Sequence, residues 1–137
     1  MKNLLLAIGI FIPLVSSAQT YQSLNRIQPD KEFHNILVRK IAEDSLSSSF
    51  VIWIKQNVKS HFHKDHSENI VVLEGEGMMT LGDSLFAIKE GDFVSIPKGT
   101  THSVTQVLSK GPLKVLSIQT PLFDGSDRIF IEQTGDY

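Results

Sequence analysis

Short apolar segments of strand length, separated by turns, recur along most of this chain of 137 residues. The turns carry glycine and proline, as in Gly82-Asp83 and Pro97-Lys98-Gly99, and such sequences typically join antiparallel strands. No segment repeats its apolar residues with the period of about 3.6 that marks an amphipathic helix. The sequence therefore predicts an all-β fold, namely a sandwich, jelly roll or barrel. Strands are expected over residues 35–41, 50–55, 69–73, 78–81, 84–88, 93–96, 101–108, 113–119 and 128–132.

Length and composition indicate a single folded domain that does not bind nucleic acid. Domains commonly contain about 100–150 residues, so the chain has room for one. Hydrophobic residues make up 41% and charged residues 20%, which is typical of a globular protein and not of a disordered one. The net charge is −2 and no basic run occurs, so the electrostatic signature of a nucleic-acid binder is missing.

Residues 1–18 have the pattern of a secretory signal peptide. Lys2 provides a positive charge, an apolar run follows, and Ser16-Ser17-Ala18 offers the small residues that precede a cleavage site. A membrane anchor is the weaker alternative, because the run is shorter than the about 20 residues of a spanning helix. We expect cleavage after Ala18 and a periplasmic or secreted protein that is not attached to a membrane.

The chain contains no cysteine. An exported protein without disulfides must be stabilised by the packing of its core or by a bound metal. Residues 19–34 are polar, contain Pro29 and show no periodicity, so we interpret them as an extended N-terminal arm. The β domain then covers residues 35–137.

Four of the five histidines lie between His61 and His102. His61 and His63 are two residues apart, and in a strand this spacing directs both imidazoles to the same face. Glu68 has the opposite parity in an unbroken strand. It can share their face if the polar residues 64–67 form a loop that resets the alternation.

The fourth candidate ligand, His102, follows a Pro-x-Gly turn and begins a strand. Val104 and Gln106 are therefore expected to line the same interior as its ring. Three neutral imidazoles and one carboxylate would then converge on one divalent cation. Such ligands suit several first-row metals, and the absence of cysteine argues only against a copper(I) thiolate site.

The residues around these histidines resemble the two sequence motifs of the cupin superfamily. The first motif, at residues 61–75, combines His-x-His with a glutamate and a glycine, and the second, at residues 91–106, combines a glycine, Pro-x-Gly and a histidine. Motif spacings of this kind rarely coincide by chance. The matching positions are His61, His63, Glu68 and Gly75 in the first motif and Gly91, Pro97, Gly99 and His102 in the second.

The sequence departs from these motifs at two positions. Lys55 stands where the first motif begins with glycine, and Gln106 stands where the second ends with asparagine. Neither change removes a ligand, although Gln106 would alter the shape and hydrogen bonding of the inner cavity. Over about residues 50–120, the resemblance implies a single-domain cupin, which is a double-stranded β-helix or jelly-roll barrel.

The resemblance also implies a metal site and a partner. It places one divalent transition metal ion, namely Mn, Fe, Ni, Cu or Zn, on His61, His63, Glu68 and His102. Open coordination positions would remain for a small-molecule ligand or substrate. Because cupins of this kind often form dimers, we expect a homodimer.

The remaining histidines and the large apolar residues have simpler interpretations. His34 has no partner nearby and is expected to be packed or to face solvent. His66 is expected to be exposed in the loop between ligands, and the alternatives are a hydrogen-bond donor to a ligand or a proton shuttle. The barrel core is expected to contain Trp53, Met78, Met79, Phe86 and Phe93, some of which would line the pocket.

Two functions remain open at this point. One is a metal-dependent enzyme that acts on a small molecule in the barrel, with oxygenase-like, isomerase or decarboxylase chemistry. The other is a non-catalytic module that binds a sugar or an organic acid through the metal. No Asp, Glu, Tyr or Lys beyond the ligands can be assigned as a general base, so the catalytic residues are unknown.

Overall fold

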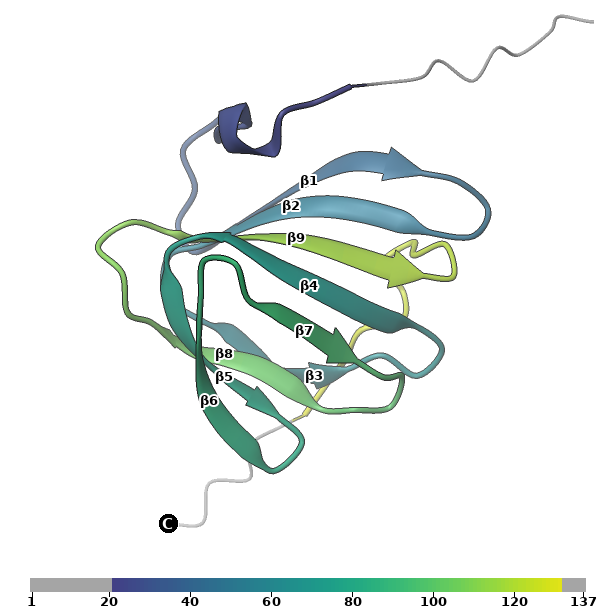
Figure 1. Cartoon of the computed structure of the whole chain (residues 1–137). Coiled ribbons are helices and arrows are strands. Elements are labelled where there is room, and N and C mark those ends of the chain that lie inside the picture. The colour runs from purple at the N-terminus through teal and green to yellow at the C-terminus, as the bar shows by residue number, and fades with distance from the viewer. Residues whose placement is uncertain (1–20, 132–137) are drawn as a thin grey trace, which may run out of the picture.

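The protein consists almost entirely of β-strands arranged in two facing sheets (Figure 1). The computed structural model describes residues 21–131, so the predicted signal peptide lies outside the described residues. One 3₁₀ helix, η1 (Leu24–Arg26), precedes the strands. The strands are β1 (Ile36–Glu43), β2 (Ser48–Ile54), β3 (Val58–Phe62), β4 (Ser67–Glu74), β5 (Glu76–Leu81), β6 (Ser84–Lys89), β7 (Phe93–Ile96), β8 (His102–Val107), β9 (Leu113–Thr120) and β10 (Ile129–Phe130).

Within residues 21–131, each sheet contains five antiparallel strands. The first has the order β1-β2-β9-β4-β7 and the second the order β10-β3-β8-β5-β6. Successive strands from β2 to β5, and again from β6 to β10, alternate between the two sheets, so the chain winds as a double-stranded β-helix. The structure confirms the predicted all-β fold of a single jelly-roll domain. Among residues 21–131, no helix is long and apolar enough to cross a membrane.

The main core fills the space between the sheets. Alternate residues of the strands point inward, as the period of two requires, and they are mostly aliphatic. Met79 belongs to this core, as predicted, whereas Phe93 is 63% exposed because its neighbours Val94 and Ile96 take the inward positions of β7. The buried members are Ile54, Ile70, Val72, Met79, Ile88, Val94, Ile96, Val104, Leu113 and Val115.

A second, smaller core lies on the outer face of the first sheet, where η1 and the segment after it cover β1 and β2 (Figure 1). Trp53 belongs to this outer core with Ile27, Leu37 and Val51. Its assignment to the barrel core is therefore wrong, because Ile54 takes the inward position next to it and the alternation directs Trp53 outward.

Lys55, which replaces the glycine of the first motif, attaches this N-terminal segment to the sheet. Its Nζ donates a hydrogen bond of 2.8 Å to the carbonyl oxygen of Phe33 and lies 4.2 Å from the centre of the Phe33 ring. Asn35 adds three hydrogen bonds to the backbone around Asn57. The arm expected to be merely extended thus packs against the domain, and its few apolar residues were too widely spaced to show a period.

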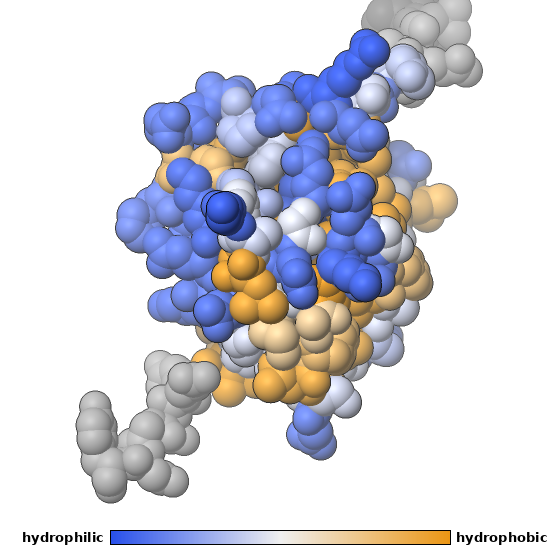
Figure 2. Space-filling model, turned by 60° about the vertical axis from the view of Figure 1, so that its left-hand side comes forward, coloured by the Kyte–Doolittle hydropathy of each residue, from blue (hydrophilic) through white to orange (hydrophobic). Residues whose placement is uncertain are grey.

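Polar and apolar side chains separate on the surface drawn in Figure 2, where apolar side chains gather in the lower half and polar ones above. Several large apolar side chains are exposed on the described part of the chain, including Leu85, Leu108 and Phe130. The homodimer implied by the family resemblance stays a prediction.

Candidate metal centre

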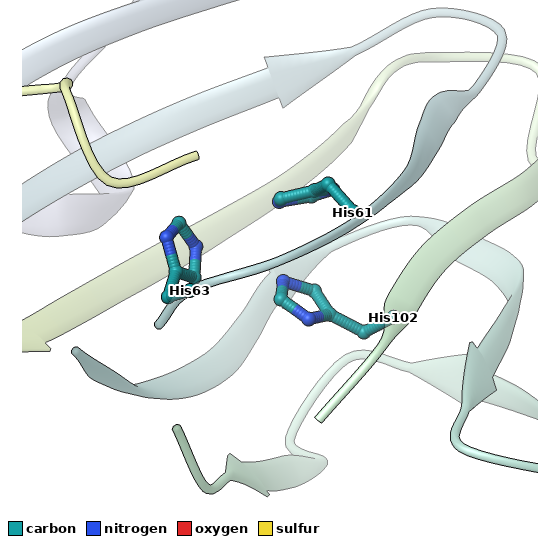
Figure 3. Close-up of side chains that lie close together, drawn as sticks. All are labelled: His61, His63 and His102. Atoms are coloured by element: carbon teal, nitrogen blue, oxygen red, sulfur yellow. The ribbon is translucent and has the colours of Figure 1, made fainter. Parts of the chain in front are cut away.

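Three buried imidazoles meet at one end of the barrel (Figure 3). His61 lies near the end of β3, His63 follows that strand, and His102 begins β8. Because β3 and β8 pair with His61 opposite His102, the register of the two strands brings these rings together. One nitrogen of each ring lies within 4.8 Å of those of the other two.

The backbone fixes the tautomer of all three rings. In each ring, Nδ1 contacts a carbonyl oxygen, which can only accept a hydrogen bond, so Nδ1 carries the proton. The lone pair of each Nε2 is then free, which is the arrangement that metal-binding histidines use. The Nδ1 atoms of His61, His63 and His102 donate to the carbonyl oxygens of Lys59, Asp127 and Thr100 at 2.8, 2.9 and 3.0 Å, respectively.

Glu68, near the start of β4, completes the cluster. Its Oε2 lies 3.5 Å from Nε2 of His63 and 3.3 Å from Nε2 of His102. Its Oε1 accepts hydrogen bonds from Ser117 and Gln119 of β9. Burial disfavours the charged carboxylate, but the adjacent His102 and His63 rings and the hydrogen bond from Ser117 outweigh burial and hold the pKa of Glu68 below its usual range.

These residues fit a divalent transition metal ion. Among the described residues, the buried Nε2 atoms of His63 and His102 have no hydrogen-bond partner. A carboxylate oxygen facing imidazole lone pairs is repelled unless a cation or a proton lies between them. Burial is the main reason that the pKa of His61 is lowered to about 4, so this ring is neutral at physiological pH, as a ligand must be.

The prediction that His61, His63, Glu68 and His102 converge is consistent with this geometry. The polar residues after His63 form a loop, and β4 resumes with Glu68 facing inward, as the sequence required. The buried cluster of three imidazoles is consistent with a metal site, and the carboxylate adjoins two of them.

The carboxylate of Asp127, a residue that no sequence pattern predicted to belong to the site, holds the loop after His63. It accepts hydrogen bonds from the backbone N–H groups of Lys64, Asp65 and His66 at 3.0, 2.8 and 3.1 Å. It also lies 2.6 Å from Nδ1 of His66. We call this contact between residues 64–66 and Asp127 the clasp. No local pattern indicates it, because Asp127 lies in an ordinary turn of the sequence.

His66 is buried in the clasp and does not point at the metal centre. The expectation that it is exposed is wrong, since only 8% of its surface is accessible. Its Nε2 lies 3.0 Å from the carbonyl oxygen of Leu122, so both ring nitrogens face acceptors and the ring is an imidazolium. Burial lowers the pKa of His66, but the bonds to Asp127 and Leu122 outweigh burial and raise it.

The same interactions lower the pKa of the partner carboxyl. Burial raises the pKa of Asp127, but the hydrogen bond from His66 and those from the backbone of Asp65 and Lys64 bring it to about 2. Phe123 packs edge-on against the rings of His63 and His66, at centroid distances of 5.3 and 5.1 Å. The segment after β9 is thereby attached to the loop that carries His63.

Gln106 does not line the interior, contrary to the prediction. Met78 and Met79 of β5 pair with Gln106 and Val104, which leaves Thr105 of β8 without a partner. This β-bulge reverses the alternation of the strand, so Gln106 is exposed and the residue after it packs against the core. His34 was expected either to be packed or to face solvent, and in the structure it is exposed.

A cavity of about 70 Å³ adjoins the metal centre. Its polar lining consists of His61, Glu68, His102, Ser103 and Arg128. The rest of its wall is aliphatic or methionine: Ile36, Val38, Ile52, Ile54, Val58, Ile70, Met79, Ile88, Val104 and Val115.

Two facing sheets wound as a double-stranded β-helix, with buried imidazoles between them, define a β-barrel protein with a candidate metal centre. The chain belongs to the cupin family, since the family model Cupin_2, described as a cupin domain, matches residues 50–119. The matched region contains all four candidate ligands.

Relatives and solved structures agree with this assignment. An uncharacterized protein of Aquifex aeolicus is 34% identical over 97 residues, which are 71% of this chain and 78% of that protein. Quercetin 2,3-dioxygenase of Bacillus subtilis is 44% identical over 43 residues, which are 31% of this chain and only 13% of the enzyme. A protein with a double-stranded β-helix domain from Klebsiella pneumoniae has the same fold, with a TM-score of 0.69 at 18% identity, covering 85% of this chain and 100% of that chain.

Proposed function

We propose that the protein is a metal-dependent oxygenase that acts on a small organic molecule in the barrel. Nε2 of His61, His63 and His102 and Oε2 of Glu68 would hold one divalent ion, namely Mn, Fe, Ni, Cu or Zn. The proposal is carried by one observation: the buried Nε2 atoms of His63 and His102 face the Glu68 carboxylate with no hydrogen-bond partner among the described residues.

A bound ion would supply a Lewis acid with open coordination positions beyond these four ligands. The chain itself supplies the rest. Ser117 and Gln119 hold Oε1 of Glu68, which leaves Oε2 directed at the three imidazoles. The aliphatic wall of the cavity limits the access of water to reacting groups, which strengthens electrostatic interactions there.

Oxygenase chemistry is preferred over isomerisation or decarboxylation because of the cavity lining. Apart from Glu68, the residues between 21 and 131 that line the cavity include no Asp, Glu, Lys or Tyr that could transfer protons. The local similarity to a dioxygenase points in the same direction. It covers a small part of that enzyme, so its substrate is not carried over to this chain.

The test is to load the purified protein separately with each of the five metals, to measure metal content, and to follow oxygen uptake over diketones, flavonoids, oxalate and sugars. We expect oxygen consumption with a redox-active metal and none with zinc, and its loss in His102→Ala. The matched control, His34→Ala, should keep it. Full metal occupancy without turnover of any compound would overturn the oxygenase proposal.

The second candidate is a module that binds a small molecule through the metal without converting it. It is favoured by the same lack of an independent proton-transfer group among the described residues of the cavity lining. Ligand-induced changes in the spectrum of a cobalt-loaded protein, in the absence of turnover, would support this alternative.

We also propose that the protein acts outside the cytoplasm, as the pattern of residues 1–18 suggests. Amino-terminal sequencing of the protein purified from its host should then begin at Gln19. A chain that retains Met1 would contradict export by cleavage.

A further inference from the structure

Among the described residues that line the cavity beside the metal centre, one has a cationic side chain, namely Arg128. Arg128 is exposed, and it forms no ion pair with any residue between 21 and 131. The guanidinium carbon lies 5.9 Å from the centre of the Phe123 ring. Its charge is therefore available to a bound molecule.

The backbone on both sides fixes the position of Arg128. The residue before it, Asp127, is held by the clasp and by the hydrogen bond from Nδ1 of His63. The residues after it form β10, in which Phe130 pairs with His61. The Phe130 and His61 rings lie 5.8 Å apart, and Arg128, which directly precedes β10, lines the same cavity as His61. Arg128 therefore lies beside His61.

The opposite side of the opening is apolar. Ile36 and Val38 line the cavity from the inner face of β1 and are 42% and 47% exposed. Their exposure places the opening at this strand, since the wall residues further inside, such as Ile54 and Val115, are buried. A molecule that enters here meets aliphatic side chains on one side and a guanidinium on the other.

The charges favour an anion. A divalent ion held by three neutral imidazoles and one carboxylate leaves one net positive charge, and Arg128 adds another. In the part of the chain that the structure describes, Glu68 is the only acidic residue of the cavity lining. A guanidinium binds a carboxylate with two parallel hydrogen bonds, which neither a hydroxyl nor an amide reproduces.

The volume of the cavity limits the size of the ligand that can be bound beyond its anionic group. A volume of about 70 Å³ is well below the roughly 300–1,000 Å³ of pockets that enclose drug-sized ligands. A compound with several fused rings would not be enclosed. The aliphatic wall instead suits a short hydrocarbon chain, which gains free energy by leaving water.

We propose that the cavity binds short monocarboxylates, with the carboxylate at Arg128 beside His61 and the hydrocarbon chain against the aliphatic wall. Arg128 is then the residue that selects the anionic substrate. This inference rests on the proposed metal site and names the class of compound that the site receives.

The test compares 3-methylbutanoate with its neutral analogue 3-methylbutanamide. Binding of each to the full-length, zinc-loaded protein is followed by NMR titration, so that no turnover is needed. The variants are Arg128→Gln and the matched control Arg39→Gln, because Arg39 is exposed on the same strand as Val38 but on the opposite face. Zinc content and thermal melting are measured for every variant.

We expect the parent and Arg39→Gln to bind the carboxylate roughly tenfold more tightly than the amide, as a lost charge-assisted hydrogen bond implies. Arg128→Gln should lose this preference and keep its zinc. A preference that survives in Arg128→Gln, or none in the zinc-loaded parent, would overturn the inference and leave the metal site standing. If the parent takes up none of the five metals, the proposed function fails. In that case the preference for the carboxylate over the amide is measured on the metal-free parent and on metal-free Arg128→Gln. Its loss in the variant would still support the role of Arg128, and its survival would overturn it.

Discussion

His66 and Asp127 form a largely buried ion pair, with Nδ1 of the imidazole 2.6 Å from Oδ2 of the carboxylate, although they lie 61 positions apart in the chain. The carboxylate also binds three consecutive backbone N–H groups, and the carbonyl of the same residue orients His63. One residue thereby positions both a candidate metal ligand and the loop that follows it.

Replacement of Asp127 by alanine should destabilise the protein by about 3 kcal/mol, because it leaves the buried imidazolium of His66 and three N–H groups without their acceptor. Urea unfolding of the metal-free protein measures this change. The exposed Asp124, whose hydrogen bonds within residues 21–131 go to Ser126, provides the control, and Asp124→Ala should leave the free energy of unfolding close to that of the parent. Equal losses in the two variants would mean that the clasp contributes nothing.

Removal of one ligand should lower metal content and stability together. In His102→Ala, the metal-to-protein ratio measured by elemental analysis should fall, and so should the increase in Tm that added metal produces. His34→Ala should match the parent in both measurements, since His34 is exposed and distant in sequence from the cluster. If His102→Ala binds metal as tightly as the parent, the four-ligand site is wrong.

Ser117 is expected to act on the metal through Glu68. Ser117→Ala removes a hydrogen bond to Oε1, so the carboxylate is less firmly oriented, and metal affinity should fall about 10- to 100-fold with unchanged stoichiometry. Competition with a chromogenic chelator measures the affinity. Ser95→Ala, on the exposed face of β7, is the matched control and should bind as the parent does.

Acid should weaken the metal-free fold through His61. Its pKa is lowered from 6.5 to about 4 on folding, so between these pH values the unfolded chain binds a proton that the folded chain does not. The free energy of unfolding therefore falls as the pH falls through this window, by at most about 1.4 kcal/mol per pH unit from this residue. His61→Gln should show a shallower decline in urea unfolding with EDTA between about pH 7 and about pH 5. An unchanged slope would contradict the lowered pKa.

Local patterns were sufficient to predict the fold and the cluster. The alternation of apolar residues and the Gly/Pro turns are properties of neighbouring residues, so the strand ranges of the second half agree closely with the structure. His61 and His63 share a face for the same reason. The spacing of motif residues then identified Glu68 and His102 as members of the same site.

The features that could not be predicted from the sequence depend on contacts between residues that are distant in the chain. Gln106 has inward parity in a regular strand, and only the unpaired Thr105 reverses it. His66 looks like an ordinary polar loop residue until Asp127 is placed beside it. Trp53 has the hydrophobicity of a barrel residue, and only the docked arm explains how it is buried on the outside.

The outer core gives the protein a built-in fluorophore. Trp53 is the single tryptophan of the chain, and Ile27 packs with it on the side of the sheet away from the histidines. Its emission should therefore report whether the N-terminal segment is docked, and it should be insensitive to occupancy of the metal centre. A red shift at low denaturant, before the sheets unfold, would reveal a state in which the arm has detached while the barrel stays intact.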